Sequence, residues 1–255
     1  MSGKLNARQR VDISAPLCYY THMEKRLTLL IDADDTVLDF ANSERDSIIL
    51  MCKQFSIPHE QEVADEFKRI NRKMWDMFEL GQITREQIFY TRFAQLFEKF
   101  DVVGVDLYAA GDAYRENMVC TKRIIYGART FLTKASRNHD LYCVTNGITR
   151  TQKMRMQASG LGKYFKKLYI SEEIGLAKPS REYFQYVLND IGDISLDSVY
   201  IIGDSLTSDV QGGINSGIKT ILFNREGKVI KDVRPDYQAR SFAELDKLVA
   251  KLSRD

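Results

Sequence analysis

The chain has 255 residues, of which 44% are hydrophobic and 28% charged, and 37 basic residues against 35 acidic ones leave a net charge of +2 at pH 7. This composition is typical of a soluble globular protein. The mixture of signs excludes a basic stripe for nucleic acid and an acidic solvating tail. No apolar run approaches the ~20 residues that cross a bilayer. We therefore expect neither a nucleic-acid partner nor a membrane.

Cysteine usage indicates the compartment. The four cysteines are far apart and include no CxxC pair: Cys18, Cys52, Cys120 and Cys143. Free thiols in a reducing compartment are the simpler interpretation, and a zinc site or disulfide framework is not expected. The histidines are equally dispersed, so Ser–His–Asp and Cys–His catalysis have little support. We predict a cytoplasmic protein.

The first predicted strand is the apolar segment Leu27–Ile31, of the kind buried in a parallel sheet. Three carboxylates follow at its carboxyl end: Asp32, Asp34 and Asp35. Such a group is electrostatically costly unless a cation or a phosphoryl group is held there, and ligands of open α/β sheets bind at that edge. The alternative is a solvated acidic turn.

The sequence after this strand is helical for roughly eighty residues, judged by the spacing of its apolar side chains. Ser43 with Asp46 predicts the cap of a first helix, and Thr84 with Gln87 predicts a capping box for a later one. A further helix is expected over residues 106–118. An all-helical insertion between two strands indicates a separate cap.

Beyond residue 127, short apolar strands alternate with helices, which indicates a parallel sheet wound on both faces. Pro179 is expected to open the helix that follows it. The predicted strands are residues 141–145, 168–171, 198–202 and 220–223. The predicted helices are residues 128–137, 151–159, 208–215 and 242–252.

The predicted fold class is therefore α/β: a doubly wound, Rossmann-like parallel sheet with an inserted all-helical cap domain. We assign residues 23–41 and 122–255 to the core domain and residues 42–121 to the cap. Residues 1–22 show no clear period and lack the apolar region of a signal peptide. We expect them to form a leader that is flexible or weakly docked.

Polar residues follow two of the later strands. Thr145 and Asn146 come before a glycine, where a hydroxyl, an amide and backbone N–H groups can hold phosphate oxygens. The same residues are good turn formers, so alone they favour a plain turn. Asp204 sits at a strand tip like the first aspartate, and Asp209 falls near a helix start, where a plain N-terminal charge is the alternative. Oxygen ligands gathered in this way suit magnesium.

The fourth segment is Lys178, which precedes a proline and so offers a fixed positive charge, although most lysines are simply solvated. With it, the chain resembles the haloacid dehalogenase superfamily of phosphohydrolases over residues 24–255. The residues that match the four motifs, in order, are Asp32 to Thr36, Thr145-Asn146, Lys178-Pro179 and Gly203 to Asp209. The stretches DADDT, TNG, ISEEIGLAKP, GDSLTSD and GGINSG resemble its pyrimidine 5'-nucleotidase subgroup. Asp35 stands where glycine is commoner in the superfamily, and this subgroup shares it.

The resemblance implies a reaction at the first motif. Asp32 would be the nucleophile that forms an aspartyl-phosphate, and Asp34 would protonate the leaving oxygen and then activate water. A spacing of two residues at a strand end lets both face one pocket. The metal would keep Asp32 ionised, while a neighbouring carboxylate favours the protonated form of Asp34, as an acid catalyst requires.

The resemblance also implies the groups around the reacting phosphate. Mg²⁺ would bind Asp32, the backbone carbonyl of Asp34, and Asp204. Thr145 and Asn146 would hold phosphoryl oxygens, and Lys178 would neutralise charge on the nucleophile and phosphate. Asp209 would support the metal's waters or Lys178. Phosphoryl transfer needs mainly such positioning and neutralisation.

Three cap residues are candidate substrate contacts. Trp75 lies off the apolar stripe of its helix and would stack on a base, and Arg85 and Arg92 would donate to a pyrimidine carbonyl or to ribose. The alternative is packing for Trp75 and solvation for both arginines.

The predicted function is a magnesium-dependent phosphatase of nucleoside 5'-monophosphates with a pyrimidine preference, acting on a small-molecule phosphate monoester as a monomer or homodimer. A phosphatase or phosphomutase acting on a sugar phosphate would share the same catalytic set. A phospho-accepting signalling module also gathers acids around magnesium, but it would be about half this length and needs no cap. A binding protein on an inactive scaffold conflicts with the intact acidic set.

Overall fold

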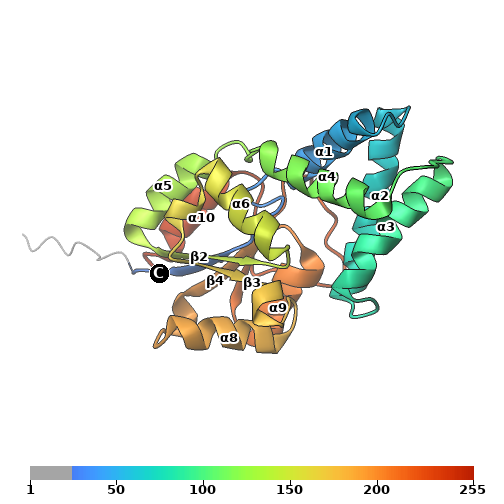
Figure 1. The fold of residues 1–255 in the computed structure, drawn as a ribbon. Helices are drawn as coiled ribbons and strands as arrows, with labels where there is room; N and C mark the ends of the chain where they lie inside the picture. The colour runs from blue at the N-terminus through green and yellow to red at the C-terminus, as the bar shows by residue number, and fades with distance from the viewer. Residues whose placement is uncertain (1–24) are drawn as a thin grey trace, which may run out of the picture.

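The structure, a computed structural model, describes residues 25–255, so the predicted leader and Cys18 lie outside the described residues. A six-stranded parallel sheet in the order β3-β2-β1-β4-β5-β6 forms the centre of the molecule (Figure 1). Its strands are β1 (Thr28–Ile31), β2 (Asp140–Thr145), β3 (Lys167–Ile170), β4 (Val199–Gly203), β5 (Lys219–Phe223) and β6 (Tyr237–Ala239). The short edge strand β6 was not predicted, because three residues are too few to show a period of two.

Successive side chains of the central strands enter two separate apolar layers. Leu29 and Ile31 of β1 pack in one cluster with residues of α5, α6 and α10, whereas Leu30 packs in another with residues of α8. Figure 1 shows these helices on opposite faces of the sheet. The doubly wound α/β fold is thus confirmed. The helices of this part are α5 (Ala128–Asn138), α6 (Thr149–Ser159), α7 (Ser171–Ile174), α8 (Arg181–Ile191), α9 (Gln211–Ser216) and α10 (Phe242–Leu252), with 3₁₀ turns at Gly162–Tyr164 and Leu196–Ser198.

The inserted segment is helical and has an apolar core of its own. Its helices are α1 (Phe40–Gln54), α2 (Glu60–Glu79), α3 (Arg85–Lys99) and α4 (Leu107–Cys120). They stand together beside the sheet in Figure 1. The rings of Phe67, Phe93 and Tyr114 meet at the centre of this cluster, with centroids 5.1 to 5.9 Å apart.

Side-chain N-caps begin five of the ten α-helices within residues 25–255, namely α1, α3, α4, α8 and α10. Thr84 and Gln87 form the expected capping box. The prediction that Ser43 caps α1 is wrong, because Asp39 accepts a hydrogen bond from the backbone N–H of Asn42 and starts the helix one turn earlier. The Ser43 hydroxyl instead donates to the Asp39 carbonyl at 2.7 Å.

Two further predictions need correction. Pro179 does not open α8, because Ser180 is the N-cap and accepts from the backbone N–H of Tyr183. The helix predicted over residues 208–215 is α9 preceded by a π-helical turn, η3 (Leu206–Val210).

The two connections between the sheet and the helices α1–α4 lie side by side. The backbone N–H of Asp39 donates to the Arg123 carbonyl at 3.2 Å, and that of Ile125 donates to the Val37 carbonyl at 3.0 Å. Leu38 pairs with Ile124 in an antiparallel bridge. The helical insertion therefore leaves and rejoins the sheet at one place.

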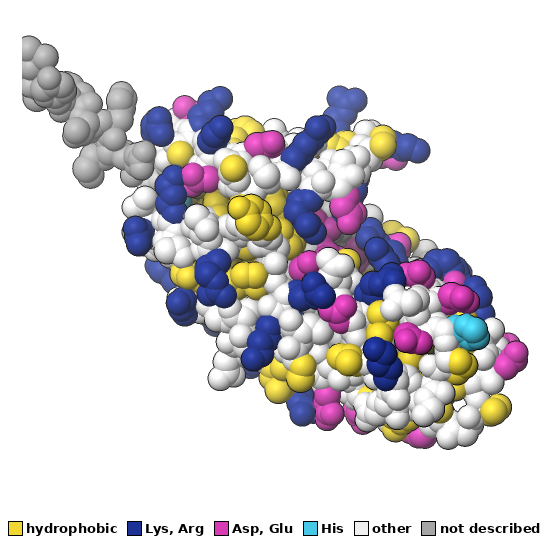
Figure 2. Space-filling model, turned by 90° about the horizontal axis from the view of Figure 1, so that it is seen from above, with side chains coloured by type: hydrophobic (Ala, Val, Ile, Leu, Met, Phe, Trp, Pro, Cys, Tyr) yellow, Lys and Arg dark blue, Asp and Glu magenta, His cyan; other side chains and the backbone are white. Residues whose placement is uncertain are grey.

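The surface shows acidic and basic side chains interspersed over much of the face drawn in Figure 2. Within residues 25–255 no helix is long and apolar enough to cross a membrane. Cys52, Cys120 and Cys143 are free thiols in this part of the chain.

Candidate active site

The carboxyl ends of β1, β2 and β4 meet at one edge of the sheet because the strands are parallel neighbours. Asp32, Thr145 and Asp204 follow or end these strands and line one cavity of about 230 Å³. The opposite wall of the cavity comes from α1 to α4. The sheet edge and the helical insertion thus enclose a single cavity, as is usual for ligand sites of open α/β sheets.

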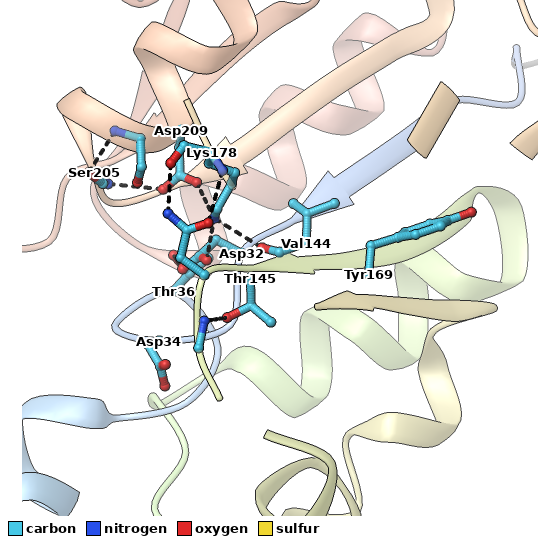
Figure 3. Close-up of polar contacts among 12 residues, drawn as sticks. Asp32, Asp34, Thr36, Val144, Thr145, Tyr169, Lys178, Ser205 and Asp209 are labelled. Carbon is cyan, nitrogen blue, oxygen red and sulfur yellow. Dashed lines mark hydrogen bonds and ion pairs between the residues drawn. The ribbon is translucent and has the colours of Figure 1, made fainter. Parts of the chain in front are cut away.

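Lys178 connects the polar groups at the floor of this cavity. Its Nζ lies 2.6 Å from Asp32 Oδ1 and 2.6 Å from Asp209 Oδ1, and it donates to the Val144 carbonyl at 3.0 Å (Figure 3). Burial by itself lowers the pKa of the ammonium, but the carboxylates of Asp209 and Asp32 outweigh burial and raise that pKa above its ordinary value. Lys178 is therefore a fixed positive charge.

Asn146 holds the loop that carries Lys178. Its Nδ2 donates to the Lys178 carbonyl at 2.8 Å, and its Oδ1 accepts from the Lys178 backbone N–H at 2.9 Å. The Asn146 side chain thus fixes the backbone of the lysine by two hydrogen bonds. Because both groups of the side chain are engaged, a phosphate at this position would contact mainly the backbone of Asn146.

Three buried or half-buried carboxylates converge beside the lysine. Oxygens of Asp32, Asp204 and Asp209 lie within 4.8 Å of one another. Burial raises the pKa of Asp32 and of Asp209, and the Lys178 charge opposes this in both. Lys178 balances only part of the negative charge on these three carboxylates. Their oxygens therefore form a donor set that fits Mg²⁺.

Lys228 balances the charge of the third carboxylate, Asp204, and no local pattern in the sequence points to this lysine. Its Nζ lies 2.6 Å from Asp204 Oδ2 and 3.0 Å from the Asp204 carbonyl. This lysine comes from the loop after β5, so only the folded chain brings it to the site.

Asp34 occupies a different part of the cavity. Figure 3 shows its carboxylate apart from the group formed by Asp32, Lys178 and Asp209. One oxygen, Oδ1, pairs with Arg155, and the other, Oδ2, accepts from Gln152 Nε2 at 2.7 Å.

Gln152 and Arg155 are functional candidates that the sequence reading missed. Both lie on α6, three residues apart and so on one face of the helix. Gln152 also donates to Thr145 Oγ1 at 2.9 Å. A Cβ at Gly147 would lie 2.5 Å from Gln152 Nε2, so the glycine after Thr145-Asn146 makes room for this side chain. Gly147 was therefore the one feature of the sequence that could have pointed to Gln152.

A model of the haloacid dehalogenase-like hydrolases matches residues 27–217. The chain belongs to this family. It is 36% identical over 224 residues to the HAD-hydrolase YfnB of Bacillus subtilis, covering 88% of this chain and 95% of that protein. A crystal structure of YfnB bound to magnesium, described as revealing interdomain movement, superposes with a TM-score of 0.83 at 35% identity over 88% of this chain and 99% of YfnB.

Two other relatives of this haloacid dehalogenase-like hydrolase are pyrimidine 5'-nucleotidases. PynA of Streptococcus pneumoniae is 32% identical, covering 85% of this chain and 92% of that protein. YjjG of Escherichia coli is 30% identical, covering 88% and 97%. The family assignment from the sequence motifs is thus confirmed.

The three cap residues selected from the sequence lie in different environments in this hydrolase. Trp75 is half-buried, lines the cavity and packs edge-to-face on Phe78 at 5.6 Å. Arg85 lies at the seam between cap and sheet, where its Nη2 donates to Ser171 Oγ at 2.6 Å and to the Asn146 carbonyl at 3.3 Å. The alternative of a solvated Arg92 is wrong, because its side chain is buried among rings in the cavity wall.

Proposed function

We propose that this chain is a magnesium-dependent phosphatase that hydrolyses nucleoside 5'-monophosphates, with a preference for pyrimidines, through an aspartyl-phosphate. Family membership and the nucleotidase relatives support the hydrolysis of phosphoric monoesters. The observation that carries the proposal is the buried Lys178, which bridges Asp32 and Asp209 on the floor of a cavity that also contains Asp34.

The first step is attack by a carboxylate oxygen of Asp32 on phosphorus. A bond forms between that oxygen and phosphorus, the bond between phosphorus and the ester oxygen breaks, and Asp34 gives its proton to the departing oxygen. Lys178 keeps Asp32 oriented and offsets charge on the phosphoryl oxygens. The products of this step are a nucleoside and aspartyl-phosphate.

The second step returns the enzyme to its starting state. Asp34 takes a proton from water, the water oxygen attacks phosphorus, and the acyl phosphate bond to Asp32 breaks. Inorganic phosphate leaves. Asp34 keeps the proton that it took from water, and this proton is the one that the next substrate's leaving oxygen requires. Gln152 and Arg155 position the Asp34 carboxylate through its two oxygens.

The metal and phosphate contacts follow the same assignment. Asp32, Asp204 and the Asp34 carbonyl would hold Mg²⁺, which supplies positive charge against the phosphoryl oxygens. Thr145 and the backbone at Asn146 would hold the remaining oxygens. Residues 23–41 and 122–255 would act as the catalytic core, with residues 42–121 as the cap that contacts the leaving group.

The test is the exchange Asp32→Asn, assayed on UMP, on glucose 6-phosphate and on p-nitrophenyl phosphate. We expect turnover to fall at least about a thousandfold, because an amide is a poor nucleophile, and EDTA to abolish wild-type turnover reversibly. Asp65→Asn is the matched control, since Asp65 is an exposed aspartate on α2. Residual turnover near wild-type in Asp32→Asn would refute the covalent mechanism, and faster turnover of the hexose phosphate would refute the nucleotide assignment.

A further inference from the structure

A buried polar cluster lies at the cap end of the cavity, where four helices meet. Each helix contributes one side chain: Glu44 from α1, Asn71 from α2, Arg92 from α3 and Tyr114 from α4. All four are buried and line the same cavity as Asp32. The steps proposed at the sheet edge use none of them.

Hydrogen bonds connect three of these residues in a row. Arg92 Nη1 donates to Asn71 Oδ1 at 3.0 Å, and Asn71 Nδ2 donates to Glu44 Oε1. Arg92 and Glu44 are thus joined through the Asn71 amide instead of touching each other. An ionisable pair inside an apolar helical cluster is costly to bury, so packing alone is a poor reason for its presence.

Arg92 also has donors to spare. Its Nε and Nη2 are buried and have no partner at standard hydrogen-bond geometry within residues 25–255, although the Tyr114 side chain interacts with the guanidinium and opposes the lowering of the Arg92 pKa by burial. The rings of Phe89 and Tyr114 lie 5.2 and 4.8 Å from its Cζ and stabilise the charge through their faces. Ring faces do not satisfy N–H groups in the plane of the guanidinium. These two N–H groups point in the same direction, as a fork for oxygen or ring-nitrogen acceptors.

We propose that Glu44, Asn71 and Arg92 form the subsite that binds the base of the nucleotide, with Arg92 donating to acceptors on the ring. The inference rests on the proposed function, because it places the base at the cap end of the cavity when the phosphate is at Asp32. Asn71 holds the guanidinium in place, and Glu44 supplies an acceptor for a ring N–H. Trp75 lines the same cavity.

The experiment compares UMP with ribose 5-phosphate, which shares its phosphate and sugar and lacks the base. In Arg92→Met, we expect the ratio of kcat/KM for UMP to that for ribose 5-phosphate to fall about ten- to one-hundredfold, the range for losing hydrogen bonds from a charged donor. Arg92→Lys and Glu44→Gln, which disturb packing less, should lower the same ratio. Arg69→Met on the outside of α2 is the matched control, and its ratio should stay at the wild-type value.

A second measurement needs no variant. Uridine should inhibit wild-type hydrolysis of p-nitrophenyl phosphate more strongly than ribose does. Equal inhibition by the two, or folded variants with an unchanged ratio, would overturn the subsite while leaving the phosphatase intact. Failure of the wild-type enzyme to hydrolyse any of these esters would instead overturn the proposed function.

Discussion

Glu44, which the proposed base subsite includes, also makes the stability of the fold depend on pH. Burial raises the pKa of its carboxyl from 4.5 to about 7, although the charge on Arg92 and the hydrogen bond from Asn71 act in the opposite direction. The folded state therefore holds the proton more tightly than the unfolded state does. The stability contributed by the protonated carboxyl is complete below pH 4.5 and is lost as the pH rises towards 7.

Glu44→Gln tests this coupling, because glutamine keeps the shape and does not titrate. The free energy of unfolding of the variant, relative to wild type, should increase between pH 4.5 and 7 by up to about 3 kcal/mol and stay constant above. Urea unfolding at several pH values measures the difference. A difference independent of pH across this window would show that Glu44 titrates at its ordinary value in the folded chain.

Helix α6 fixes the orientation of the Asp34 carboxylate. Gln152 and Arg155 reach both oxygens of that carboxylate from one helix face. The orientation of Asp34 thus depends on a segment more than a hundred residues later in the chain. A correctly oriented acid matters most when the leaving oxygen is a poor leaving group, as in a nucleotide.

Arg155→Met should therefore lower kcat for UMP by about 10- to 100-fold with little change in KM, because the variant loses control of Asp34 and keeps the rest of the cavity. The burst of p-nitrophenolate from p-nitrophenyl phosphate should change much less, since that group leaves without a proton. Rapid-quench and steady-state assays give the two quantities. Arg150→Met, an exposed exchange on the same helix, is the control, and equal losses for both substrates would remove the positioning role.

The elements themselves were largely predictable from the sequence, and the contacts between them were not. Strand and helix periods, with the box at Thr84, depend on near neighbours in the chain. Arg155 and Lys228 have no local signal, because each meets its carboxylate only after the sheet has assembled. Asn146 lines the cavity, but its side chain binds the Lys178 backbone, so its contact with phosphate stays a prediction.

At the scale of the whole molecule, the sheet and the helical insertion have separate apolar cores and meet through polar contacts. Arg85 bonds to Ser171, and Glu79 at the end of α2 accepts from Thr207 in the π-helical turn. The acidic cluster lies on the sheet side of this seam. A cation bound there would relieve repulsion among carboxylates of the folded state that the unfolded chain holds apart.

Mg²⁺ should therefore raise the melting temperature, by about 5–10 °C at a concentration one hundred times Kd. Asp204→Asn should lose most of that increase, because it removes one of the converging carboxylates without disturbing the Lys178 contacts. Calorimetry with Mg²⁺, against NaCl at equal ionic strength, separates binding from screening. A shift of the same size in both salts would exclude a specific cation site.

The paired connections at Leu38 and Ile124 restrict how the cap can move relative to the sheet. Two independent tethers would allow the cap to tilt and twist in several directions. Here backbone hydrogen bonds join the outgoing and returning segments into a two-stranded ribbon, so bending one segment bends the other. We therefore expect any bending between the cap and the sheet to be concentrated at this ribbon, and such bending would change the distance between the cap residues of the cavity wall and the aspartates at the sheet edge.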